Sequence, residues 1–116
     1  MRNLESRIQR SCVEWFRRQF PRLADLLFAV PNGGARSAVT GAILKGEGVL
    51  AGVADLLLLV PNRKYHGLCI EMKSPKGRQS ASQKQWEKAV TKQGFKYIVC
   101  HSFDEFYNGI MIYFTE

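Results

Sequence analysis

The chain is short, basic and ordinary in its apolar content. It has 116 residues, of which 46% are hydrophobic and 23% charged, and this mix predicts a single folded domain rather than a disordered, collagen-like or coiled-coil chain. Lysine and arginine number 17 against 10 acidic residues, which gives a net charge of +7. A positive excess of this size favours a polyanionic partner, with nucleic acid as the first candidate and an unspecialised basic protein as the alternative.

We expect a cytoplasmic protein, encoded by a bacterium or a phage, with no membrane partner. The cysteines and the N-terminal segment indicate the intracellular location. Cys12, Cys69 and Cys100 are far apart and odd in number, which favours reduced thiols over a disulfide framework or a zinc ribbon. The first ten residues are too polar for a signal peptide. The longest apolar run, residues 56–61, is far shorter than the ~20 residues that cross a bilayer.

Hydropathy periodicity and turn signals predict helices interleaved with strands along the whole chain. In chain order we expect a helix from Leu4 to Phe16 bounded by Asn3 and Pro21, a strand over 27–30, a helix over 37–45, strands over 53–60 and 68–74, a helix between Ser80 and Gly94, a strand over 97–100, a short helix from Ser102 to Gly109, and a last strand over 110–114. The pattern indicates an α/β or mixed α+β domain in which helices flank one sheet.

The predicted strand over 68–74 carries a charged pair that indicates chemistry. Because side chains alternate across a strand, Glu71 and Lys73 share one face while Met72 between them faces the core. A carboxylate and an ammonium are costly to place on an otherwise apolar strand unless they have a function. The simpler alternative is a surface ion pair on an edge strand.

Asp55 adds a second carboxylate in the preceding strand. If the two strands pair as a hairpin, Asp55 and Glu71 converge, and two close carboxylates repel unless a cation lies between them. Oxygen ligands suit a hard cation such as Mg²⁺ or Mn²⁺. Lys73 could orient a water nucleophile or neutralise charge on a phosphate. Together these groups predict metal-assisted phosphodiester hydrolysis in one acidic pocket open to solvent.

These residues also resemble a known nuclease family. Asp55 followed by Glu71-Met72-Lys73 resembles the PD-(D/E)xK nuclease signature, with Ala54 in place of the proline. More specifically, the chain resembles the VRR-NUC (virus-type replication-repair nuclease) domain from Glu5 to about Val99. The matching segments are Pro31-Asn32-Gly33-Gly34-x-Arg36, Gly48-Val49-x-x-Gly52-Val53-x-Asp55, Gly67-Leu68-x-Ile70-Glu71-x-Lys73, Ser80-x-x-Gln83-x-x-Trp86 and Gly94.

The resemblance implies a fold, a cofactor and a catalytic set. The fold would be a single α/β domain over residues 1–116 with a restriction-endonuclease-like core, a mixed β-sheet flanked by helices. Asp55 and Glu71 would bind Mg²⁺ or Mn²⁺, with the Met72 carbonyl as a possible third ligand. Lys73 would act on the water, and Glu5 and Gln83 would complete the catalytic set.

Simpler explanations exist for part of this set. Glu5 in a first helical turn is favoured by the helix dipole alone. Gln83, the third residue of its predicted helix, could act only as a capping residue. Gln9 lies one turn after Glu5 and could line the same face, although we expect it to be solvated.

Two loops are expected to contact DNA. Asn32, Gly33 and Arg36 could bind phosphates through backbone N–H groups and a guanidinium, although a tight turn alone would explain the glycine. Lys76 and Arg78 follow the predicted strand directly and form a basic loop suited to contacts with the DNA backbone.

These observations together predict a small metal-dependent endodeoxyribonuclease. The resemblance implies activity similar to that of Holliday-junction resolvases, which act as homodimers on branched DNA in repair. A non-catalytic DNA-binding subunit with the same fold is the first alternative, and the complete set of Asp55, Glu71 and Lys73 argues against it. A basic α/β domain that binds protein partners is the second alternative.

Overall fold

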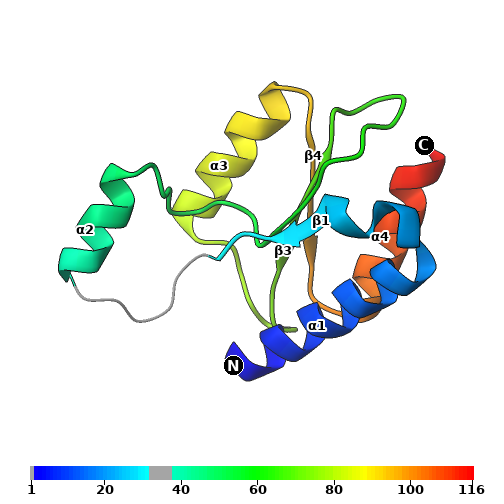
Figure 1. Ribbon diagram of the computed structural model, residues 1–116, viewed down its shortest axis with the longest axis horizontal. Coiled ribbons are helices and arrows are strands. Elements are labelled where there is room, and N and C mark those ends of the chain that lie inside the picture. The colour runs from blue at the N-terminus through cyan, green and yellow to red at the C-terminus, as the bar shows by residue number, and fades with distance from the viewer. Residues whose placement is uncertain (1, 32–37) are drawn as a thin grey trace.

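A four-stranded sheet lies between helices in the computed structural model, which describes residues 2–31 and 38–116 (Figure 1). The elements are α1 (Arg2–Gln19), the 3₁₀-helix η1 (Pro21–Leu26), β1 (Leu27–Ala29), α2 (Ala38–Gly46), β2 (Leu56–Leu58), β3 (Leu68–Met72), α3 (Ala81–Lys92), β4 (Lys96–Cys100) and α4 (Phe103–Thr115). The fold is therefore mixed α/β, as the sequence predicts. No helix among the described residues is long and apolar enough to cross a membrane.

The sheet is mixed, in the order β1-β2-β3-β4. β2 pairs antiparallel with both β1 and β3, whereas β3 pairs parallel with β4. The hairpin expected between the strands that contain Asp55 and Glu71 is confirmed for β2 and β3, in which Leu56 pairs with Ile70. α3 connects β3 to β4, which matches the helical crossover that a parallel pair requires.

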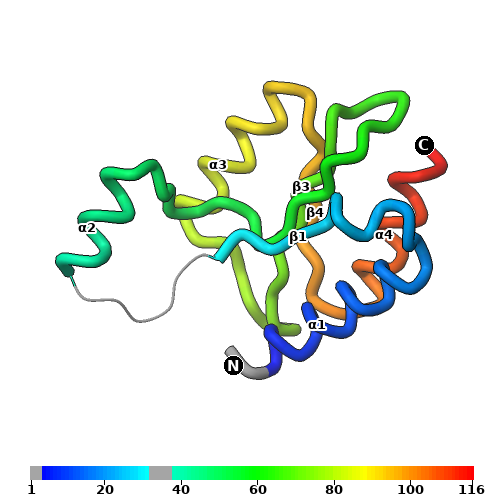
Figure 2. The backbone as a smooth tube through the Cα atoms, in the orientation of Figure 1, coloured from blue at the N-terminus to red at the C-terminus, as the bar shows by residue number. Residues whose placement is uncertain are grey.

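One face of the sheet packs against α1 and α4, which lie side by side (Figure 2). This core contains buried residues of both helices and of all four strands: Cys12, Phe16, Leu27, Leu56, Leu58, Leu68, Ile70, Met72, Cys100, Phe106, Ile110 and Tyr113. The other face of the sheet meets α3, and all five residues of β3 are buried. β3 is thus a central strand covered on both faces, a typical setting for a long apolar run.

The boundaries of α3 follow from local sequence. Ser80 and Gln83 form a capping box, in which the Ser80 side chain accepts from the Gln83 N–H and the Gln83 side chain accepts from the Ser80 N–H. Gly94 follows the helix with a φ of +90°, and a Cβ there would lie 2.6 Å from the His66 ring. Only glycine satisfies both the backbone angle and this close approach.

The prediction of a last strand over residues 110–114 is wrong, because this segment is helical. α4 continues from Phe103 to Thr115 without a break, since Phe106, Ile110 and Tyr113 recur at helical spacing and bury one face. Gly109 does not end the helix. A Cβ at Gly109 would lie 2.7 Å from Ile98 Cδ1, so the glycine allows α4 to approach β4 closely.

Three predicted strands are shortened at their ends. The strand predicted over 53–60 is regular only over Leu56–Leu58, the one predicted over 27–30 only over Leu27–Ala29, and the one predicted over 68–74 only over Leu68–Met72. The helix predicted over 37–45 is observed as α2, which stands away from the sheet (Figure 1) and has no buried residue.

Candidate active site

The β2–β3 hairpin brings two carboxylates to the same end of the sheet. Because Leu56 pairs with Ile70, the continued register sets Asp55 opposite Glu71. The Asp55 backbone is held by its carbonyl, which accepts from the Val30 N–H at 2.8 Å. Its side-chain Oδ2 accepts from the Met72 N–H at 2.7 Å. Asp55 is therefore fixed by both neighbouring strands.

Glu71 is fully buried and is held through one of its oxygens. Oε1 accepts from the Tyr97 hydroxyl and from Gln79 Nε2, the latter at 3.1 Å. Oε2 has no hydrogen-bond partner among the described residues. Lys73 Nζ lies 3.2 Å from this oxygen and forms an ion pair with it, although not in hydrogen-bond geometry. Burial of the hydroxyl, followed by its bond to Glu71, raises the pKa of Tyr97, so Tyr97 is a neutral donor.

Gln83 links the charged pair to the start of α3. Its Oε1 accepts from Lys73 Nζ at 2.9 Å and from the Ser80 N–H at 2.7 Å. The capping explanation and the contact with the lysine therefore both hold for this one side chain. Lys73 is consequently placed between two acceptors, Glu71 and Gln83.

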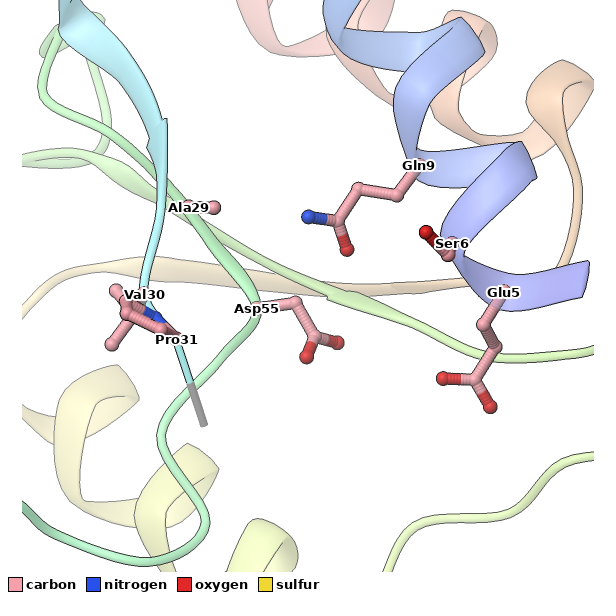
Figure 3. Close-up of a pocket in the computed structure, with 7 residues that line it drawn as sticks. All are labelled: Glu5, Ser6, Gln9, Ala29, Val30, Pro31 and Asp55. Atoms are coloured by element: carbon pink, nitrogen blue, oxygen red, sulfur yellow. The ribbon is translucent and has the colours of Figure 1, made fainter. Parts of the chain in front are cut away.

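A cavity of about 240 Å³ opens beside Asp55 (Figure 3). Its polar lining comes from Glu5, Ser6 and Gln9 of α1 on one side and from Asp55 on the other, and Ala29 to Pro31 complete it. Gln9 lines the same face as Glu5, as the sequence allowed: its side chain is half-buried and extends into this space (Figure 3).

Of the three residues predicted to share one open pocket, the cavity described here includes one. Asp55 lines the cavity, but Glu71 and Lys73 do not contribute to its wall. The reason is that the hairpin directs Glu71 beneath the segment that leads into α3, where Gln79 and Tyr97 contact it.

The electrostatics of Asp55 show how close these groups are. Burial is the largest effect that raises the pKa of Asp55 above its usual value, and repulsion from Glu71 and Glu5 raises it further. The Met72 N–H and the Lys73 ammonium act in the opposite direction without cancelling these effects. The site therefore holds more negative charge than its own cation can neutralise.

The donor set fits a cation that retains much of its water. Among the described residues, no group of three or more His, Cys, Asp or Glu side chains is arranged to hold a metal ion. Asp55 and Glu71 each have one oxygen bonded to the protein and one without a hydrogen bond in the described part of the chain. Mg²⁺ is commonly bound by one or two carboxylates and several waters, and these two residues match that donor set.

Comparison with known proteins identifies the family. The family model of the VRR-NUC domain matches residues 3–104. The chain belongs to the VRR-NUC family. A solved structure described as a VRR_NUC domain protein is 27% identical, and the match covers 97% of this chain and 88% of that one with a TM-score of 0.84. No curated protein has significant similarity to the chain.

The VRR-NUC match includes all the residues named so far in the site, because each lies within 3–104. It shows a nuclease-type fold and makes nuclease activity the expectation for this chain. Its span ends near the start of α4, at residue 104, so most of that helix lies outside the matched segment.

The expected DNA contacts of this VRR-NUC domain are only partly described. Lys76 and Arg78 are on the loop after β3, where Lys76 is exposed and Arg78 lies beyond the turn at Gly77. The loop is held at its centre by the Gly77 carbonyl, 3.1 Å from His101 Nε2. The other expected contacts, Asn32, Gly33 and Arg36, lie outside the described residues.

Tyr97 and Gln79 are contacts of Glu71 that the sequence alone did not indicate. Tyr97 reaches Glu71 because β4 lies parallel beside β3, with Glu71 paired to Val99. Gln79 reaches it from the segment before α3. The available signal was a tyrosine hydroxyl at the start of the strand predicted over 97–100, and without the strand order this signal does not identify a partner.

Proposed function

We propose that this VRR-NUC domain is a metal-dependent endodeoxyribonuclease that hydrolyses DNA phosphodiester bonds. The observation that carries the proposal is the meeting of Asp55, Glu71 and Lys73 at one end of the β2–β3 hairpin, next to a polar cavity. A carboxylate pair with an adjacent lysine provides both a cation site and a group that acts on water or phosphate.

Asp55 and Glu71 would hold Mg²⁺ or Mn²⁺ through their oxygens that lack hydrogen bonds, and the Met72 carbonyl is proposed as a further ligand. When bound, the cation would polarise the phosphate and favour ionisation of an attacking water. The raised pKa of Asp55 supports this role, because its causes are burial first and then repulsion from Glu71 and Glu5, and a bound cation would offset both.

Lys73 would orient the water or neutralise charge that develops on the phosphate. Its contact with Gln83 at 2.9 Å supports this role, because the ammonium keeps an acceptor when the cation occupies Glu71. Glu5 lines the cavity opposite Asp55 and would hold waters of the cation from that side.

The partner is proposed to be DNA. The net charge of +7 supports long-range attraction to a polyanion, and Lys76 and Arg78 supply two cations on the loop after β3. Asn32, Gly33 and Arg36 belong to the same proposal as phosphate contacts.

The test is a cleavage panel of linear, flapped and four-way DNA with Mg²⁺, Mn²⁺ or EDTA. Glu71→Gln and Lys73→Ala should abolish cleavage while DNA binding stays within a few-fold of the parent. Lys92→Ala, an exposed lysine in the last turn of α3, serves as the control and should cleave normally. Cleavage that persists in EDTA, or unchanged cleavage by either site variant, would reject the proposed chemistry.

A non-catalytic DNA-binding subunit remains the second candidate, because Glu71 is fully buried in the described structure. This candidate predicts DNA binding without cleavage of any substrate in the panel, with either metal. Preference for the four-way substrate would support the narrower proposal of branched-DNA selectivity.

The protein is further proposed to act as a homodimer. α2 supports this because none of its residues is buried, while Val39 and Ile43 are 70% and 56% exposed. Isolated short helices are marginal in water, so an apolar helix that is not packed favours a partner surface. Light scattering should give a dimer for the parent and a monomer for the Val39→Glu/Ile43→Glu variant. A parent that is monomeric at micromolar concentration with DNA would contradict symmetric action on a junction.

A further inference from the structure

We propose that Tyr97 and Gln79 are positioning residues that determine which oxygen of Glu71 is available to a cation. The proposal rests on the proposed function and extends it from the ligand to the groups that orient the ligand. It is carried by an asymmetry in the contacts of one buried carboxylate.

Both neutral donors near Glu71 bind the same oxygen. The Tyr97 hydroxyl and Gln79 Nε2 both donate to Oε1, and neither donates to Oε2. The two oxygens of a carboxylate are chemically equivalent, and the terminal torsion of a glutamate side chain is soft. The surroundings alone therefore distinguish the two oxygens of Glu71. Two donors on the same oxygen fix the rotation of the Glu71 carboxylate.

In the described part of the chain, the remaining oxygen forms an ion pair but no hydrogen bond. Oε2 is buried and without a hydrogen bond among the described residues, and Lys73 Nζ lies 3.2 Å away. A buried carboxylate oxygen without a hydrogen bond is costly, which marks it as a position for a ligand. Because Lys73 also contacts Gln83, the ammonium can give up Oε2 and still retain a partner.

The two donors are themselves held in place. Tyr97 is half-buried on β4, and its ring centroid lies 6.1 Å from that of Trp86. Gln79 Nε2 also donates to Glu87 Oε1 of α3 at 2.8 Å. One amide group therefore bridges Glu71 and Glu87, and a strand and a helix together align Glu71.

Groups that hydrogen-bond to metal ligands change metal affinity by about 10- to 100-fold when they are removed. Without the Tyr97 hydroxyl, Glu71 keeps only one neutral donor and can rotate between its contacts. We therefore expect Tyr97→Phe to raise the dissociation constant for Mn²⁺ by about 10-fold, with a smaller increase for Gln79→Met. The Mn²⁺ concentration that gives half-maximal cleavage should rise in parallel, while the rate at saturating Mn²⁺ changes little.

Tyr113→Phe is the matched control. Tyr113 is buried, and its hydroxyl, like that of Tyr97, donates one hydrogen bond, but its acceptor is the Val60 carbonyl and not Glu71. Both variants lose one buried hydroxyl, so a general loss of stability affects both, whereas a loss of ligand orientation affects Tyr97→Phe alone.

The measurement is titration of the purified protein with Mn²⁺, without DNA, by calorimetry and by the electron paramagnetic resonance signal of free Mn²⁺. Weaker binding in Tyr97→Phe with parent-like binding in Tyr113→Phe supports the proposal. Equal affinity in all three proteins overturns it while the proposed function stands, and absence of Mn²⁺ binding by the parent overturns both. If Tyr97→Phe does not fold, Gln79→Met decides by the same criterion.

Discussion

Gly52 lies in the segment before β2, where its backbone packs closely against the start of α3. Replacing Gly52 should therefore be unusually destabilising. Its φ is +89°, and a Cβ there would lie 2.5 Å from the Ser82 carbonyl oxygen and 3.0 Å from the Gln83 nitrogen. A side chain in this backbone region costs about 1–3 kcal/mol. Forcing a methyl group against fixed backbone costs roughly another 1–3 kcal/mol. Gly52→Ala should therefore lower the free energy of unfolding by about 2–6 kcal/mol.

Two other glycines separate the backbone cost from the packing cost. Gly48 has a φ of +106°, but a Cβ there would meet nothing within 4 Å, so Gly48→Ala should show only the backbone cost of about 1–3 kcal/mol. Gly41 lies within α2 with the same open space. Gly41→Ala should stabilise the helix by up to about 1 kcal/mol.

The assay is urea denaturation of the parent and the three variants, monitored by circular dichroism. The expected order of stability, from highest to lowest, is Gly41→Ala, parent, Gly48→Ala, Gly52→Ala. If Gly52→Ala and Gly48→Ala lose the same amount, the contact with Ser82 makes no contribution and the reasoning is refuted.

Two further predictions concern the charge of the site. Since the pKa of Asp55 is raised in the folded protein, its ionisation opposes folding as the pH rises from the unfolded value of about 3.9 through the folded one. Asp55→Asn retains an acceptor for the Met72 N–H. In urea denaturation at pH 7 its free energy of unfolding should therefore exceed that of the parent by about 0.5–2 kcal/mol. This difference should become smaller towards pH 4, and a difference that grows on acidification would contradict the reasoning. Mg²⁺ at about 100 times its dissociation constant should stabilise the parent by ~2.7 kcal/mol. The measurement is the Tm, which should rise with Mg²⁺ in the parent but not in Glu71→Gln. An equal rise in both proteins would show that the cation binds elsewhere.

Much of the local structure near the site was predictable because its signals are local. The capping box at Ser80 and Gln83 is set by residues three apart, and the structure contains it. The β2–β3 hairpin followed from two apolar runs with a short connection, which placed Asp55 opposite Glu71. In both cases the structure depends on residues that are close to one another in the sequence.

The errors arose where distant contacts decide the outcome. Residues 110–114 alternate too little to distinguish a strand from a buried helix, and packing of Ile110 and Tyr113 against the sheet makes them helical. The surroundings of Glu71 depend on how β4 lies beside β3. The helix between the two strands is typical of a parallel pair, but it does not determine which residues of β4 lie beside Glu71. Tyr97 was therefore missed, although Glu71 itself was identified.

The same contacts lead us to expect that the candidate site lowers the stability of the fold. Glu5 and Glu71 repel the charge of Asp55, and Lys73 acts in the opposite direction, so the site carries excess negative charge in a protein whose net charge is +7. A DNA phosphate drawn to the basic surface would be repelled at this position, because like charges at short range in a partly buried site are poorly screened. A divalent cation between Asp55 and Glu71 would remove both the internal repulsion and the repulsion of the phosphate. The arrangement that is expected to weaken the folded protein in the absence of metal is therefore the one that would make cleavage depend on metal.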